Sequence, residues 1–117
     1  GRLRRLAGSV DAVLVDCLTL WVSNLLLRGD ADDVILTEGE ALAALVVAGP
    51  FGVTLVSNEV GAGVHPSTSE GLRFRDLLGL VNQQVAAAVD RVVLMVAGLP
   101  LTVKEVRRTD DVPVPTP

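Results

Sequence analysis

The spacing of apolar residues along this chain of 117 residues changes repeatedly between the patterns of strands and helices. Short apolar runs at 12–15, 53–57 and 91–97 are rich in β-branched residues and predict three strands. A turn at 98–100 follows the third run, and residues 101–103 predict a short fourth strand. Longer stretches between the runs predict helices, so the pattern indicates an α/β domain.

Helix-starting and helix-ending residues divide these longer stretches. The first helix follows the first strand and closes at Gly29, because glycine favours helix C-termini. Residues 30–33 then predict an acidic loop. Thr37 and Glu40 have the spacing of a capping box, which predicts that the second helix starts there and ends at Gly49.

The third predicted helix is the longest. Ser67 and Glu70 have capping-box spacing, and an apolar stripe extends over residues 74–89. Strands separated by helices of this length are most simply parallel, with right-handed crossovers between them.

Polar or flexible residues close each predicted strand. Asp16 closes the first strand, Ser57-Asn58-Glu59 the second, and Gly98 follows the third. Since the carboxyl ends of parallel strands share one edge of a sheet, we expect these residues to converge. Open α/β sheets bind their ligands at that edge.

Composition narrows the class of protein. Hydrophobic residues make up 50% of the chain and aromatic residues 3%, so the core is aliphatic, as in a parallel sheet covered on both faces. The net charge of −4 and the scattered arginines argue against nucleic acid as a partner. Cys17 is the single cysteine, which excludes a disulfide framework. With no apolar run long enough for a membrane span, the expectation is a cytoplasmic α/β domain.

Asp16 is the first candidate site residue. An aspartate that closes an apolar strand has the character of a Walker B carboxylate, which holds Mg²⁺ directly or through water beside nucleotide phosphates. Aspartate is also a preferred helix N-cap, so a purely structural role for Asp16 stays open.

The segment after the second strand carries Asn58, Glu59, Gly61 and Gly63. These polar side chains lie where a ligand binds at a sheet edge, and the glycines permit positive φ or a close backbone approach. The same residues are also ordinary turn residues. The sequence contains no G-x-x-x-x-G-K-[ST] phosphate loop, and its one lysine is Lys104.

Two aromatic residues are assigned more simply. His65, the one histidine, is favoured as a structural or substrate-contacting residue, because no nucleophile motif or second imidazole accompanies it. Trp21 lies on the apolar face of the first helix and predicts a core position.

The third helix carries further polar candidates. Arg73 and Arg75, with Asp76, could bind phosphate, although a charged helix face is the commoner explanation. Asn82 and Gln83 interrupt an aliphatic helix and need polar partners, one of which could be a ligand.

Four ordered blocks resemble the bifunctional adenosylcobinamide kinase/adenosylcobinamide-phosphate guanylyltransferase family of cobalamin biosynthesis. They are residues 13–26 (VLVDCLTLWVSNLL), 56–66 (VSNEVGAGVHP), 74–90 (FRDLLGLVNQQVAAAVD) and 96–104 (VAGLPLTVK). The resemblance implies a P-loop-NTPase-like fold with a mostly parallel sheet flanked by helices, and assembly as a homo-oligomer.

The resemblance also implies an activity. Such an enzyme phosphorylates the aminopropanol hydroxyl of adenosylcobinamide with ATP or GTP and Mg²⁺, then transfers GMP from GTP to that phosphate through a guanylylated histidine. Asp16 matches the family's acidic nucleotide-contacting position. Asn58, Glu59, Gly61 and Gly63 match its second motif, which lines the cleft.

The family's phosphate loop and nucleophilic histidine are absent from this sequence. His65 matches the glycine-rich block, so it does not take the covalent role. We therefore expect residues 1–109 to form a partial nucleotide-binding α/β domain, truncated at its amino terminus, which is inactive alone. Residues 110–117 (DDVPVPTP) predict a Pro-rich tail or linker.

Two other functions stay open at this stage. One is a non-catalytic α/β binding or scaffold module that has lost its phosphate loop. The other is a different P-loop kinase, which explains residues 58–66 less well.

Overall fold

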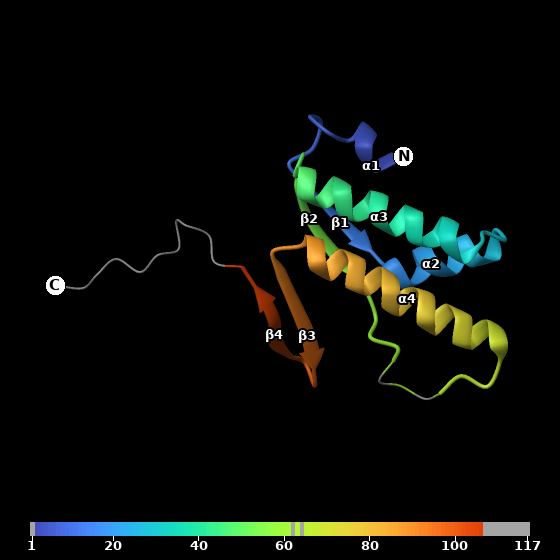
Figure 1. Ribbon diagram of the computed structural model, residues 1–117. Coiled ribbons are helices and arrows are strands. Elements are labelled where there is room, and N and C mark those ends of the chain that lie inside the picture. Colours follow the sequence, from blue (N-terminus) through green and yellow to red (C-terminus); the bar gives the residue numbers. More distant parts are fainter. Residues whose placement is uncertain (1, 62, 64, 107–117) are drawn as a thin grey trace.

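The computed structural model describes residues 2–61, 63 and 65–106. The predicted tail at 110–117 lies outside these residues. In chain order the elements are α1 (Arg2–Arg5), β1 (Ala12–Asp16), α2 (Leu18–Leu27), α3 (Asp32–Ala48), β2 (Gly52–Val56), α4 (Ser69–Ala88), β3 (Arg91–Val96) and β4 (Leu99–Glu105) (Figure 1). Within the described part of the chain, no helix is long and apolar enough to cross a membrane.

Strands β1 and β2 form a parallel pair, as the pattern of the sequence predicts. Their register places Ala12 beside Gly52 and Asp16 beside Val56. Helices α3 and α4 lie over one face of the pair (Figure 1). Val15 and Leu55 point into that face and pack against the core, whereas Leu14 on the opposite face is 67% exposed.

The core lies between this strand pair and the helices. Its buried residues are all aliphatic and come from α2, α3 and α4, namely Leu18, Val22, Leu25, Ile35, Leu42, Leu77, Leu78, Val81 and Val85. Each such side chain, when fully buried, contributes about 1.5–3 kcal/mol to folding. Trp21 packs against this cluster, which confirms its predicted core position.

The prediction that β3 joins the same parallel sheet is wrong. Strand β3 pairs with β4 in a separate antiparallel sheet, and Val96 faces Leu99 across a tight turn. The two turn residues, Ala97 and Gly98, both have positive φ, as a two-residue hairpin turn of type I′ requires. Because this hairpin takes Gly98 away from β1 and β2, the glycine does not converge with Asp16.

Two predicted helix starts are also displaced. Helix α3 begins at Asp32, within the predicted acidic loop, because carboxylates in a first turn interact favourably with the helix dipole. Thr37 instead lies inside α3 and donates to the carbonyl of Asp33 at 2.8 Å. The cap of α4 is Thr68, whose hydroxyl accepts from the N–H of Gly71 at 3.0 Å.

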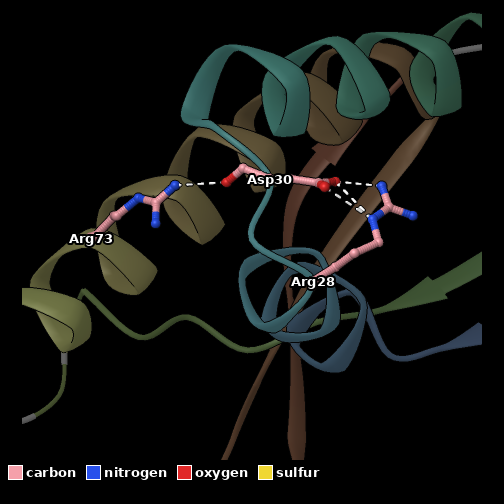
Figure 2. Close-up of polar contacts among 3 residues, drawn as sticks. All are labelled: Arg28, Asp30 and Arg73. Atoms are coloured by element: carbon pink, nitrogen blue, oxygen red, sulfur yellow. Dashed lines mark hydrogen bonds and ion pairs between the residues drawn. The ribbon is translucent and has the colours of Figure 1, made fainter.

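The loop before α3 is held by charged side chains (Figure 2). The Arg28 guanidinium binds both carboxylate oxygens of Asp30, and this hydrogen bonding lowers the pKa of Asp30. Arg73 of α4 donates to the backbone oxygen of Asp30 at 2.8 Å and pairs with Asp32. Arg73 therefore ties α4 to the start of α3, which accounts for its charge without a phosphate.

Gly39 allows α3 and α4 to approach closely. A Cβ atom at this position would lie 2.0 Å from Oε1 and 3.1 Å from Cδ of Gln84. The Gln84 amide has little freedom to retreat, because its Nε2 donates to the backbone oxygen of Leu36 at 3.0 Å.

Gly39→Ala should therefore destabilise the chain. Overpacking costs about 1–3 kcal/mol and the loss of the Gln84 hydrogen bond about 1 kcal/mol, which exceeds the helix-propensity gain of about 1 kcal/mol. Urea unfolding measures the difference. Gly79→Ala in α4 is the matched control, since no atom lies within 4 Å of its Cβ position and stability should rise by about 0.5–1 kcal/mol. Equal effects of the two substitutions would contradict this packing.

Candidate functional site

Asp16 lies at the carboxyl edge of the parallel pair. It is the last residue of β1 and stands in register with Val56, so the segment that follows β2 begins beside it. Its carboxylate is exposed and makes no hydrogen bond or ion pair with the described residues. The N-cap of α2 is Cys17, without a side-chain cap bond, so Asp16 does not serve as the cap. The structure thus leaves its charge free for a ligand.

A chain of side-chain hydrogen bonds fixes the segment after β2. The hydroxyl of Thr19, in the first turn of α2, donates to Oδ1 of Asn58 at 2.8 Å. Asn82 of α4 donates through Nδ2 to the backbone oxygen of Asn58 at 3.0 Å, and its Oδ1 accepts from the Ser57 hydroxyl at 2.6 Å. The predicted convergence of Asp16 with residues 57–59 is therefore confirmed, and Asn82 has the polar partners it was expected to need.

The following loop carries Gly61 and Gly63, for which the sequence predicts either positive φ or a close backbone approach to a ligand. Gly61 does not have positive φ, so a left-handed backbone is not the reason for this glycine. Instead, the N–H of Gly61 donates to Oε1 of Glu59 at 3.0 Å, and a Cβ at Gly61 would come within 3.0 Å of that oxygen. The loop thus curls around the Glu59 carboxylate, and one of its oxygens stays without a described partner.

An open hollow of about 470 Å³ lies beside this loop. Its lining comes from the loop and from one face of α4, and consists of Glu59, Gly61, Arg75, Asp76, Gly79, Leu80 and Gln83. Thus Glu59 and Gln83, both singled out in the sequence, border the same space.

Arg75 joins His65 to the hollow. Its guanidinium binds Oδ1 of Asp76 at 3.1 Å and approaches Nδ1 of His65 at 3.1 Å. Because a guanidinium can only donate, Nδ1 of His65 accepts, and the imidazole proton of the neutral ring lies on Nε2. His65 therefore contacts the border of the hollow and has no described nucleophile beside it.

The described residues hold no group of three or more histidine, cysteine or acidic side chains placed to bind a metal ion. A divalent ion at this edge would have Asp16 as a protein ligand and would take its other ligands from water or a bound phosphate, which is the usual pattern for Mg²⁺. Sequence reasoning assigned no role to Thr19 or Gly79, although both lie in the blocks that carry the family resemblance, because each gains its place from tertiary packing.

Comparison with known proteins identifies the family. The family model described as cobinamide kinase / cobinamide phosphate guanyltransferase matches residues 2–103. This chain belongs to that family. The match extends across β1, the segment after β2, α4 and most of the hairpin, so it includes every residue of the candidate site.

Three curated members of the cobinamide kinase family are similar to the chain. The bifunctional adenosylcobalamin biosynthesis protein CobP of Pseudomonas aeruginosa is 43% identical over 104 residues, which are 87% of this chain and 58% of that protein. The proteins named CobU of Salmonella typhimurium and Escherichia coli are 40% and 39% identical, over 80% of this chain and 59% of their own length. The chain therefore spans about three-fifths of the length of these relatives.

Asn82→Ala should loosen the site. The substitution removes two hydrogen bonds that hold Ser57 and Asn58, each worth about 0.5–1.5 kcal/mol, so the free energy of unfolding should fall by about 1–3 kcal/mol. The neighbouring Gln83→Ala is the control, because Gln83 is exposed and should change stability by about 0.5 kcal/mol or less. Urea unfolding of both variants tests this, and equal stabilities would show that the Asn82 bonds contribute nothing.

Proposed function

We propose that this chain forms part of an enzyme of cobalamin biosynthesis that phosphorylates adenosylcobinamide and transfers GMP from GTP to adenosylcobinamide phosphate. The observation that carries the proposal is the unpaired Asp16 at the carboxyl edge of β1, within a chain matched by the family model over residues 2–103. Parallel α/β sheets bind nucleotides at this edge.

Asp16 is the residue we assign to the nucleotide. Its exposed carboxylate would hold Mg²⁺, directly or through a water molecule, beside the phosphates of GTP or ATP. When bound, the ion neutralises charge on those phosphates. Asp16 would hold the ion in a fixed position relative to β1. It can do so only if its carboxylate is not already paired with a neighbouring cationic side chain.

The loop after β2 supplies the other half of the cleft. Asn58 is held by Thr19 and Asn82, so its backbone position is fixed before a ligand arrives. Glu59 then projects an exposed carboxylate from this fixed point. We propose that Asn58, Glu59, Gly61 and Gly63 contact the substrate, and we assign no covalent role to His65.

The chain covers 58% of the Pseudomonas aeruginosa protein, and we propose that residues 1–109 correspond to the carboxyl-terminal part of such an enzyme. The phosphate loop and the nucleophilic histidine would come from the remaining two-fifths. A cytoplasmic location and assembly as a homo-oligomer are part of the same proposal.

Asp16→Asn should reduce turnover in a protein that joins this chain to the uncovered two-fifths of the Pseudomonas aeruginosa relative. Asparagine keeps the size of the side chain but removes its charge. GMP transfer should fall by about tenfold to a thousandfold, or about 1.4–4 kcal/mol of transition-state stabilisation. Radiolabelled GTP and steady-state rates measure the loss.

The matched control is Asp11→Asn, the same substitution just before the opposite end of β1. Asp11 is also exposed, and the rate of GMP transfer by Asp11→Asn should stay within twofold of the rate of the parent protein. The free energies of unfolding derived from melting curves of the two variants and the parent protein should agree within about 0.5 kcal/mol, the usual range for exposed substitutions. Full GMP transfer by the Asp16→Asn protein would end the assignment of Asp16 to the nucleotide.

A further inference from the structure

Gly79 has no structural explanation within the fold. Glycine is less favourable than alanine inside a helix, and Gly79 lies in the middle of the 20-residue helix α4. The other glycines of the described helices have packing reasons, since a Cβ at Gly39 would meet Gln84 and a Cβ at Gly71 would lie 2.9 Å from Pro66. A Cβ at Gly79 would have no atom within 4 Å, and its φ is not positive.

Gly79 does line the open hollow beside the Glu59 loop. A bare stretch of helix backbone at such a place allows a ligand to approach more closely than any side chain would permit. Next to it, Leu80 presents an apolar surface that is 43% exposed. Gly79 and Leu80 therefore give the hollow an apolar strip along α4, which we call its floor.

The rim of the hollow carries unused hydrogen-bonding groups. The Gln83 amide is exposed and has no hydrogen bond to the described residues, so it offers both a donor and an acceptor. One carboxylate oxygen of Glu59 is available as an acceptor, and the Arg75 guanidinium retains N–H groups beyond those bound to Asp76 and His65. A ligand that fits therefore presents an apolar face to Gly79 and Leu80 and hydrogen-bonding groups, such as amides, to the rim.

We propose that this hollow binds the corrin ring of the cobinamide substrate, with the ring plane over Gly79 and Leu80 and its primary amides at Glu59 and Gln83. The choice of ligand rests on the proposed function, whereas the location of the binding site rests on the residues that line the hollow. A corrin ring has the required shape, because it is broad, rigid and edged by primary amides. The hollow is open, which leaves space for a ligand of this breadth.

The test is equilibrium dialysis of the 117-residue chain against dicyanocobinamide, which is coloured and carries the corrin ring without a phosphate or nucleotide. The parent chain should bind it, and Gly79→Leu should weaken binding by at least tenfold because the side chain fills the floor of the hollow. Gln83→Ala should weaken binding about two- to tenfold, as expected for one lost hydrogen bond. Saturating GTP should leave binding unchanged.

Glu40→Leu is the control for an added apolar side chain, since Glu40 is exposed on α3 and makes no contact with the hollow. It should bind dicyanocobinamide as the parent does, and melting curves should show Gly79→Leu folded. Absence of binding by the parent chain, equal binding by Gly79→Leu, or competition by GTP would each overturn the corrin site. Failure of the proposed function is a separate result, because it appears as full GMP transfer by the Asp16→Asn protein.

Discussion

The parallel pairing of β1 with β2 is the constraint on which the rest of the structure depends. It sets Asp16 beside Val56, so the end of one strand and the segment after the other begin at the same edge. The pairing is stable because Val15 and Leu55 of its covered face pack against an aliphatic cluster from three helices. A shift of register by one residue would turn these side chains to the uncovered face and separate Asp16 from the Glu59 loop.

The polar contacts at this edge are divided between fixed and free groups. Thr19, Ser57, Asn58 and Asn82 satisfy one another through uncharged hydrogen bonds and hold the loop in place. None of them neutralises the carboxylate of Asp16. Arginine charge is used elsewhere, since Arg73 ties α4 to the start of α3. This division is what a site for a charged ligand needs, because the scaffold is rigid while the functional carboxylate stays unpaired.

Local patterns predicted the elements better than their partners. The runs that form β1 and β2, the closure of α3 at Gly49 and the turn at Gly98 follow from residue type and spacing. The start of α3 does not follow from residue type and spacing, because Asp32 and Asp33 suit an acidic loop and a helical first turn equally. Strand β3 has the composition of a sheet strand, but composition does not determine which strand it pairs with. The need of Asn82 for partners was visible in the sequence, whereas its partners, 24 and 25 positions earlier, are set by the path of the loop.

The most direct test of the central claim is whether a metal–nucleotide complex binds at this edge. Mn²⁺ with GTP, added to the isotope-labelled chain, broadens the NMR signals of nearby amides, and Mg²⁺ with GTP serves as the non-paramagnetic reference. The account predicts broadening at Asp16, Thr19 and Asn58 and none at Gly98 in the hairpin turn. The broadening should exceed that caused by Mn²⁺ alone and disappear in Asp16→Asn. Broadening centred on another surface, or unchanged in Asp16→Asn, would contradict the account.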